Sequence, residues 1–408
     1  MSTLTTTSVH PRVTLAILPL LAIAATAINL RTAVTGFSPL LETIGADLDF
    51  GPAVYGIFGT IVTASFAVFG LLAPLIARTL SLEVTIAIAT MLTTTGVLLR
   101  AGAPGTAGLI ASTVIAFAGV GASNVLIVPL VKKYFPQHLK LVTSMYLALL
   151  QVGQFVAPLS TVPLADAGGW RFAIGIWAAP VALATVLWIV VMLRSRRTQP
   201  AVIAAKPGRI AGAWRSSLLW SMVLLFGMTA LNTYAIISWL PTILTDAGIA
   251  PATSATLLAL FSVFGLGAAF VIPPLTLRLR SPFGIVLACS LLLAVGYAGL
   301  AASPLAGTIV WVVCLGLGVS TFPMCLTLIN ARTRTPAGSA TLSGAMQGLG
   351  YGLACVGPLC IGLLYGATRT WTGSFVLLFA SVAVMIVSGW VASRPRLLED
   401  AVEPRTSR

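Results

Sequence analysis

The chain has 408 residues, of which 58% are hydrophobic and 8% are charged. Because soluble domains carry roughly 25% charged residues, this composition excludes a soluble globular protein and indicates a membrane protein. The formal net charge is +14 at pH 7. In a membrane protein such an excess of Lys and Arg reflects topology and contact with anionic lipid, so we expect no nucleic-acid partner.

Twelve apolar runs follow one another along the chain, and Pro, Gly or charged residues separate most of them. One helical crossing of a bilayer needs about 20 apolar residues. The sequence therefore predicts an all-α integral membrane protein with twelve transmembrane helices. Their predicted limits are 13–40, 53–78, 83–101, 106–131, 141–164, 171–194, 216–243, 253–277, 282–302, 306–330, 338–366 and 372–392.

The longest polar connection, residues 195–215, is basic and contains Pro200 and Pro207. It divides the chain into two predicted six-helix halves, 1–194 and 216–408. When both termini are placed in the cytoplasm, most Lys and Arg residues fall on the cytoplasmic side, as the positive-inside rule requires. We therefore predict cytoplasmic termini, a cytoplasmic linker and a multi-pass protein of the bacterial inner membrane. The exceptions are Arg100, Arg171 and Arg369 on the outer side and Arg31 within the membrane.

Short motifs of the first predicted half recur in the second at an offset of about 200 residues. Two six-helix halves that repeat each other favour a substrate site near the bilayer midplane, between the halves. The paired motifs are Pro74-x-x-x-Arg78 with Pro274-x-x-x-Arg278, Gly119-x-Gly121 with Gly316-x-Gly318, Ala157-Pro158 with Gly357-Pro358, and Ser38-Pro39 with Leu240-Pro241.

Further motifs carry a resemblance to a known family: Asn29-Leu30-Arg31 with Ser38-Pro39-Leu40-Leu41, Pro129 to Pro136 with Lys132-Lys133, Gly169-Trp170-Arg171, and Trp239-Leu240-Pro241 with Asp246-Ala247-Gly248. In them the chain resembles the major facilitator superfamily and, more narrowly, the cyanate/2-nitroimidazole transporter family. The resemblance implies secondary transport of a small anionic or polar solute, a cyanate-like monoanion or a nitroimidazole-like compound, by alternating access. Pro74 stands where the superfamily's loop signature commonly has Asp. The resemblance therefore does not predict the usual interaction between acidic and basic residues in that loop.

Arg31 is the only charged residue that we expect deep inside an apolar run. A guanidinium cannot escape burial by losing its proton, and at the centre of a bilayer helix it costs at least ~2.5–3.5 kcal/mol. We expect no Asp or Glu in another run to pair with it. The sequence therefore predicts that Arg31 binds an anionic or electron-rich substrate. A structural arginine satisfied by helix carbonyls is the alternative.

Helical geometry, at about 100° per residue, sorts the polar neighbours of Arg31 into two faces. Thr35 and Ser38 share the face of Arg31, whereas Asn29 lies on a nearly opposite face. We therefore predict that Thr35 belongs to the substrate site. Asn29 is predicted to form hydrogen bonds between helices.

Polar and aromatic residues of other predicted helices complete the candidate site. For the two Gln of 141–164 and the stripe of Ser343, Gln347 and Tyr351, hydrogen bonds between helices are an equal alternative. The predicted substrate-binding residues are Arg31, Thr35, Gln151, Gln154, Tyr234, Gln347 and Tyr351. The residues predicted for helix packing or gating are Asn29, Asn124, Pro158, Asn330 and Pro358.

The sequence offers no cluster typical of catalysis or metal binding. His10 and His138 lie in predicted polar loops, and the five Cys lie in apolar segments without a Cys-x-x-Cys spacing or a His companion. We expect no metal, no cofactor and no enzymatic activity, and a monomer in the bilayer with a small-molecule substrate. A multidrug-type efflux carrier of small apolar compounds and a membrane-embedded enzyme are the alternatives. The substrate, the direction and coupling to protons or a counter-ion stay open.

Overall fold

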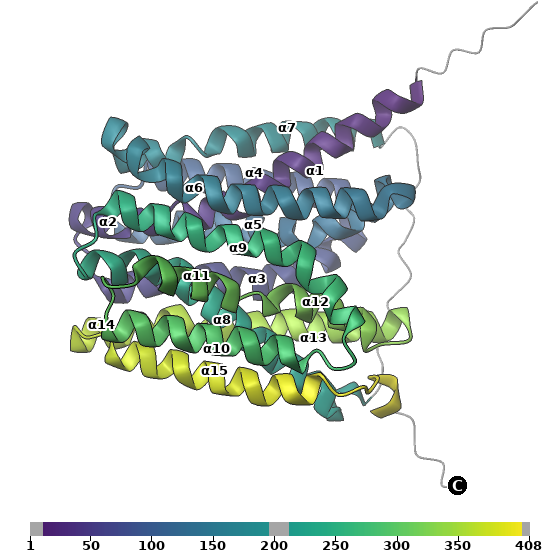
Figure 1. Ribbon diagram of the computed structural model, residues 1–408. Helices are drawn as coiled ribbons and strands as arrows, with labels where there is room; N and C mark the ends of the chain where they lie inside the picture. Colours follow the sequence, from purple (N-terminus) through teal and green to yellow (C-terminus); the bar gives the residue numbers. More distant parts are fainter. Residues whose placement is uncertain (1–10, 196–211, 402–408) are drawn as a thin grey trace, which may run out of the picture.

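The computed structural model describes residues 11–195 and 212–401, and within these ranges the regular elements are helices that run side by side in a bundle (Figure 1). His10 and most of the predicted linker 195–215 lie outside the described residues. The apolar composition of the runs accounts for the architecture. In hydrocarbon a backbone N–H or C=O group finds no water, so a spanning segment forms its hydrogen bonds within its own helix.

The observed helices follow the predicted runs within a few residues at most ends. In residues 11–195 they are α1 (Pro11–Thr35), α2 (Leu41–Leu48), α3 (Pro52–Leu80), α4 (Leu82–Ala101), α5 (Thr106–Tyr134), α6 (Leu139–Gly175) and α7 (Ala178–Ser195), with short 3₁₀ turns η1 (Ser38–Leu40) and η2 (Pro136–His138). In residues 212–401 they are η3 (Ala213–Arg215), α8 (Ser217–Asp246), α9 (Pro251–Arg278), α10 (Phe283–Ala302), α11 (Thr308–Gly318), α12 (Thr321–Ala331), α13 (Pro336–Ala354), α14 (Val356–Thr368), α15 (Thr372–Ala392) and η4 (Glu399–Ala401).

Four of the predicted runs are interrupted in ways that the apolar pattern does not reveal. The run 171–194 contains the end of α6 and most of α7, with the break at Ile176 and Trp177. The run 13–40 ends as a helix at Thr35 and continues through η1 into α2. The run 306–330 is divided into α11 and α12 at Val319 and Ser320, and the run 338–366 is divided into α13 and α14 at Cys355.

Eleven helical segments within the described ranges are long and apolar enough to cross a membrane. One of them, Leu141–Ser195, has 55 residues, which as a straight helix would measure about 80 Å against roughly 30 Å of hydrocarbon. It contains Gly169, whose φ of 77° and ψ of 166° interrupt the helix. The prediction of twelve helices counts this segment as two crossings, and it stays a prediction.

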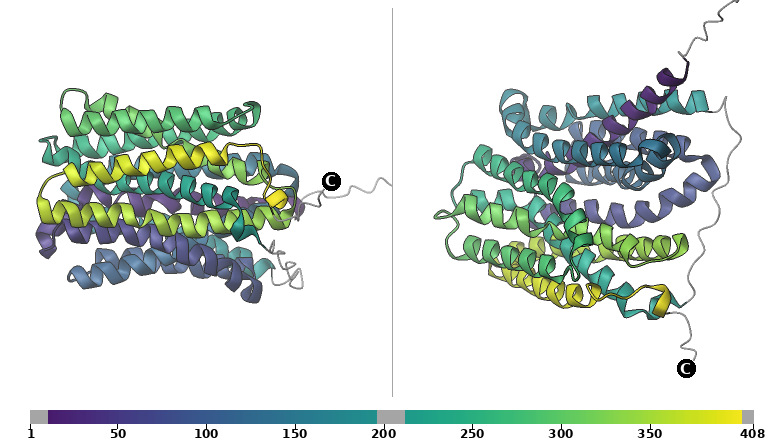
Figure 2. Two further views of the ribbon diagram at one scale, coloured as in Figure 1. Left: turned by 90° about the horizontal axis from the view of Figure 1, so that it is seen from below. Right: turned by 45° about the vertical axis from the view of Figure 1, so that its right-hand side comes forward.

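The two described ranges lie side by side. In Figures 1 and 2 the helices α1, α4, α6 and α7 lie on one side of the bundle, and α10, α13 and α15 lie on the other. The ranges meet where η1, α3 and α6 contact α8, α9, α13 and α14. Residues from both ranges are therefore available to any site at this contact.

The two ends of the bundle differ in charge. The end that carries α2 holds Glu42, Asp47 and Asp246, and we call it the acidic end. The opposite end holds Lys132, Lys133 and Arg278, and we call it the basic end. Which end faces the cytoplasm stays a prediction, as do the cytoplasmic termini.

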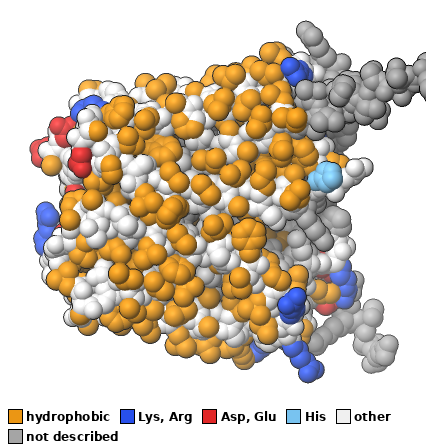
Figure 3. All heavy atoms as spheres, turned by 45° about the horizontal axis from the view of Figure 1, so that its top comes forward, with side chains coloured by type: hydrophobic (Ala, Val, Ile, Leu, Met, Phe, Trp, Pro, Cys, Tyr) orange, Lys and Arg blue, Asp and Glu red, His pale blue; other side chains and the backbone are white. Residues whose placement is uncertain are grey.

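The outer surface between the ends is apolar. Figure 3 shows hydrophobic side chains spread over the face between the two charged ends. Large side chains such as Leu277 and Val376 are 65% and 63% exposed. In water such an apolar surface would promote aggregation. On a bundle of this length it is the surface that lipid tails require.

Candidate functional site

Arg31 lies on α1 at the contact between the two described ranges, with only 8% of its surface exposed. Its Nη1 donates a hydrogen bond to the hydroxyl of Tyr234 on α8. The guanidinium carbon is 5.7 Å from the ring centroid of Phe66 on α3 and 5.6 Å from that of Tyr234. The charge is therefore held among aromatic faces, which attract cations through their quadrupoles.

The aromatic side chains around Arg31 form a connected cluster, which we call the aromatic cluster: Phe66, Tyr234, Tyr351 and Phe226. The ring of Phe66 is 5.8 Å from that of Tyr234 and 5.2 Å from that of Tyr351, between centroids. Phe226 meets Tyr351 edge to face at 5.1 Å, a geometry that aromatic pairs favour. Because α3 comes from one range and α8 and α13 from the other, the cluster joins both.

The charge of Arg31 has no carboxylate partner in the described residues. The ion pairs found there are Lys133 with Glu83, Arg171 with Asp47 and Arg334 with Asp400. Nε of Arg31 is buried and has no hydrogen-bond partner. The guanidinium thus keeps donor capacity and a net charge that the surrounding side chains do not neutralise, and an anion or a nitro group would complement both.

Of the predicted substrate-binding residues, Arg31, Tyr234 and Tyr351 lie together. Thr35 lies on the predicted face but is fully buried, and its hydroxyl donates to the carbonyl of Arg31 at 3.1 Å. Back-bonding of this kind to residue i−4 satisfies the hydroxyl within its own helix. Thr35 therefore positions the turn that carries Arg31.

The predicted glutamines lie elsewhere along the contact. Gln154 of α6 donates from Nε2 to Oγ of Ser262 on α9 at 3.3 Å. Gln151 packs against Gly265 of α9, where an added Cβ would lie 2.3 Å from its Nε2. Both residues therefore join the two ranges at the α6–α9 contact.

Gln347 of α13 donates from Nε2 to Ser343 Oγ, one turn earlier, at 2.8 Å. Side chains four residues apart on a helix face each other, which explains the pair. The stripe that the sequence predicts along this helix is present. Its two polar members bond to each other, while Tyr351 belongs to the aromatic cluster.

Pro358 illustrates how the two ranges approach each other. It is buried, its carbonyl accepts a hydrogen bond from Nε1 of Trp239 at 3.1 Å, and its ring packs on Gly59 of α3. A Cβ at Gly59 would lie 2.6 Å from Cβ of Pro358, so glycine is required at this crossing. The arrangement fits the predicted packing or gating role.

The remaining residues predicted for packing or gating are more dispersed. Asn29 donates to the carbonyl of Ala25 at 2.7 Å, and this bond lies within α1 rather than between helices as predicted, because the carbonyl one turn earlier is nearest. Asn330 is exposed and accepts from Ser339 at 3.0 Å. Pro158 is buried within α6, and Asn124 is half-buried on α5.

Contacts between the ranges also close the acidic end. Ser38 donates to the carbonyl of Ile237 at 2.5 Å, and Thr245 donates to Glu42 Oε1 at 2.7 Å. Tyr55 packs on Trp239 with a centroid separation of 6.0 Å. These contacts therefore lie between Arg31 and the acidic end.

Arg31 is not the only buried charge in the described residues. Arg100, at the end of α4, is 1% exposed; its Nη1 donates to the carbonyl of Ala33 at 3.2 Å, and its guanidinium carbon lies 4.0 Å from the ring centroid of Phe37. The sequence had placed it on the outer side. It lies against the end of α1, where the helix ends at Thr35, and the side of the membrane stays a prediction.

A buried acid was also missed. Glu83, in the first turn of α4, is 2% exposed, and its Oε1 lies 2.6 Å from Nζ of Lys133 and accepts from the hydroxyl of Tyr134 at 2.6 Å. These partners come from the end of α5, fifty residues further along the chain. The pair is at the basic end and is satisfied locally, so it leaves Arg31 without an acid.

Sequence relatives are transporters. The family model described as Major Facilitator Superfamily matches residues 21–358. The chain is 32% identical to the uncharacterized transporter YycB of Bacillus subtilis (strain 168) over 385 residues, 93% of this chain and 94% of the relative. It is 30% identical to the 2-nitroimidazole transporter of Escherichia coli (strain K12) over 372 residues, 91% and 94% of the two chains. It is 24% identical to the cyanate transport protein CynX of the same organism over 370 residues, 90% and 94%.

The fold has close counterparts among solved structures. A bacterial homolog of the human lysosomal transporter Spinster, in an inward-facing and occupied conformation, superposes with a TM-score of 0.74 at 16% identity, covering 98% of this chain and 100% of the other. At that identity the likeness concerns the fold. Family match, relatives and fold agree: the chain is a multi-pass membrane protein that belongs to the Major Facilitator Superfamily, a superfamily of transporters and not of enzymes.

Proposed function

We propose that this transporter carries a small anionic or polar solute, a cyanate-like monoanion or a nitroimidazole-like compound, and that Arg31 is the residue that binds it. The observation that carries the proposal is the buried guanidinium itself. It lies at the contact between the two ranges, it lacks a carboxylate partner among the described residues, and its Nε has no hydrogen-bond partner. A protein retains an uncompensated buried charge at a cost, which binding of an oppositely charged or electron-rich ligand offsets.

The neighbours of Arg31 narrow the solute class. One guanidinium faces hydroxyls and rings, and the corresponding segment of α8 offers Asn232, Thr233 and Tyr234 rather than a second basic residue. This favours a monoanion or a neutral polar solute over a dianion. The rings of Phe66 and Tyr351 suit a planar, electron-poor molecule through stacking, and two relatives carry names that refer to 2-nitroimidazole and cyanate.

The transport cycle that we propose is alternating access between the two six-helix halves, 1–194 and 216–408. The Arg31–Tyr234 bond and the aromatic cluster join the two ranges at the site, and Ser38, Glu42 and Thr245 join them at the acidic end. Rocking of one half against the other would break the acidic-end contacts and make new ones at the basic end. In the predicted orientation, the described conformation is closed toward the outside.

The test is uptake into proteoliposomes of the full chain, with labelled cyanate, small monocarboxylates and 2-nitroimidazole offered separately. We expect uptake of at least one of them by the wild type. Arg31→Ala is expected to lower that uptake at least tenfold, because it removes the charge that holds the solute. Lys132→Ala, which removes an exposed positive charge at the basic end, is the matched control and is expected to transport normally.

Equal uptake by Arg31→Ala and the wild type would overturn the assignment of Arg31. A wild type that takes up none of these solutes, yet exports a cationic dye, would favour the multidrug-type alternative. The same assay with an imposed pH gradient tests coupling. If uptake follows the gradient, protons are the coupling partner; if it follows only an opposing gradient of the same solute, the transporter is an exchanger.

A further inference from the structure

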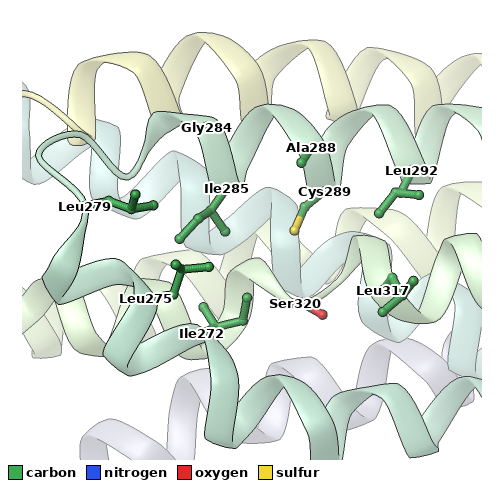
Figure 4. A pocket seen from close by; sticks show the side chains of 10 residues that line it. All are labelled: Ile272, Leu275, Leu279, Gly284, Ile285, Ala288, Cys289, Leu292, Leu317 and Ser320. Atoms are coloured by element: carbon green, nitrogen blue, oxygen red, sulfur yellow. The ribbon is translucent and has the colours of Figure 1, made fainter.

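A cavity lies away from Arg31, among helices of the C-terminal range. It has a volume of about 380 Å³ and lies between α9, α10 and the junction of α11 and α12 (Figure 4). Figure 4 shows side chains from all these elements pointing into it. The cavity is lined by Ile272, Leu275, Leu279, Gly284, Ile285, Ala288, Cys289, Leu292, Leu317 and Ser320.

The sequence explains why this volume is unfilled. Pro273 and Pro274 interrupt the hydrogen bonds of α9 beside the cavity, and the break between α11 and α12 brings Ser320 to its wall. On α10 two of the lining residues, Gly284 and Ala288, are small, and a Cβ added at Gly284 would meet no other atom within 4 Å. Two interrupted helices and two small residues of α10 therefore leave a gap that neighbouring side chains do not fill.

The cavity opens at the periphery of the bundle. α10 packs against α11, α12 and α15, and its side chains Leu291 and Val295 are exposed. Leu275, Leu279 and Leu317 on its walls are 38%, 41% and 39% exposed, whereas Ile285 and Cys289 are nearly buried and form its floor. Because the surrounding surface is the apolar one that faces lipid, an occupant reaches the cavity from the bilayer and is itself apolar over most of its length.

The mouth of the cavity at the basic end is positively charged. Leu279 lies between Arg278 and Arg280 in the chain, and both arginines are exposed. Neither takes part in an ion pair in the part of the chain that the structure describes. Two exposed guanidiniums next to an apolar gap match an occupant with a phosphate at one end and a hydrocarbon chain at the other, because guanidinium pairs with phosphate in a bidentate manner.

We propose that the cavity between α9, α10 and the α11–α12 junction binds an acyl chain of an anionic phospholipid, with its phosphate on Arg278 and Arg280. The volume is within the range of small-molecule sites, and the charge selects an anionic headgroup over a zwitterionic one. The site is separate from Arg31 and does not depend on which solute is transported. It lies beside α9, which contacts α6 across the boundary between the ranges.

The experiment is native mass spectrometry of the full chain, purified in detergent and titrated with phosphatidylglycerol or with phosphatidylcholine of the same chains. For the wild type we expect phosphatidylglycerol to bind about tenfold more tightly, because each basic residue near the headgroup adds to the attraction. The double substitution Arg278→Ala and Arg280→Ala changes only exposed side chains and is expected to reduce phosphatidylglycerol binding to the level of phosphatidylcholine.

The apolar part of the site is tested with two matched substitutions on α10. Ala288→Phe fills the cavity and is expected to weaken binding of both lipids. Ala298→Phe, at an equally exposed alanine that does not line the cavity, is expected to change neither. Equal affinity of the wild type for the two lipids would overturn the proposal, and so would unchanged binding in a folded Ala288→Phe protein.

Discussion

Arg31 and Arg100 are both buried guanidiniums, with 8% and 1% of their surface exposed, yet their surroundings differ in kind. Arg100 binds the carbonyl of Ala33 and packs on Phe37 and Phe117, so all three partners come from residues 11–195. Arg31 binds Tyr234 of the other range and packs on Phe66. The more deeply buried charge therefore has its partners within one described range, and the less deeply buried one has partners in both.

Burial alone therefore does not distinguish the arginine that we propose to bind substrate from one that completes a helix end. The amide of Phe37 donates to Val34 O at 3.3 Å, so the carbonyl of Ala33 at the end of α1 is free to accept from Arg100. Arg100 therefore completes a helix end, as a basic residue near a C-terminus commonly does. Arg31 meets only a hydroxyl and rings, and part of its donor capacity is unused.

The largest expected effect is that of Arg31→Met on ligand binding. Losing a charge-assisted hydrogen bond costs about 1.5–3 kcal/mol, which corresponds to roughly 10–150-fold in Kd. The melting temperature is expected to stay unchanged or rise, because an apolar side chain replaces a buried charge that has no carboxylate partner. Both quantities can be measured by thermal unfolding of the purified protein with and without ligand. A melting temperature lowered by several degrees would favour the structural alternative for Arg31.

Arg100→Met is expected to lower the stability of the protein and to leave ligand affinity nearly unchanged. It leaves the carbonyl of Ala33 without its donor and removes the stacking on Phe37, so the free energy of unfolding falls by about 1–3 kcal/mol. The Kd for ligand, measured at a temperature where the variant is folded, is expected to stay within twofold of the wild type. Arg100→Lys, which keeps the charge but not the planar group, should also lose stability. If Arg100→Met abolishes binding without loss of stability, the contrast between the two arginines fails.

The sequence predicts the helices well because their signal is local. The last run was placed at 372–392, and α15 spans Thr372–Ala392. Arg31 could also be identified from its apolar neighbours in the chain. Its partner Tyr234 was included in the site as an aromatic side chain of the run 216–243 that could stack on a planar solute.

The features that the sequence missed depend on contacts between distant segments. Arg100 stands at the end of its run beside a Gly- and Pro-containing loop, and only the packing of Phe37 and Phe117 over it makes it buried. Phe66 is one of 17 phenylalanines, and no spacing marks it as the neighbour of Arg31. From the sequence, Glu83 is expected to be an exposed residue of a first helical turn. It is buried because Lys133 and Tyr134 from the end of α5 pack on it.

A smaller effect is expected for Tyr234→Phe, which tests the bridge between the ranges. The ring stays in the aromatic cluster, but Arg31 loses its only side-chain acceptor in the described residues. We expect a threefold to tenfold higher Kd, about 1 kcal/mol. The matched control is Tyr297→Phe, which removes a buried hydroxyl bonded to Asn232 at 2.6 Å within the C-terminal range. Ligand affinity equal in the two variants would mean that the Tyr234 hydroxyl has no part in binding.

The smallest effect is expected at Glu399, a charged residue near solvent at the basic end whose carboxylate accepts hydrogen bonds. Burial acts to raise its pKa, but hydrogen bonds from the amides of Thr335 and Arg334 and from the Thr335 hydroxyl outweigh it and hold the pKa of the carboxyl below its usual value. A lowered pKa in the folded state means that the contribution is present above the unfolded value of about 4.3 and is lost as the pH falls through the folded pKa.

Because Glu399 is half-buried, its contribution is expected to be below about 1 kcal/mol. Glu399→Gln should therefore lower the melting temperature slightly at pH 7 and by less at pH 4, so that the two curves converge in acid. Arg31 and Arg100 keep their charge across this range, since a guanidinium does not titrate there. Their effects should be independent of pH, and a Glu399→Gln deficit that persists at pH 4 would show that the side chain acts through its shape and not through its charge.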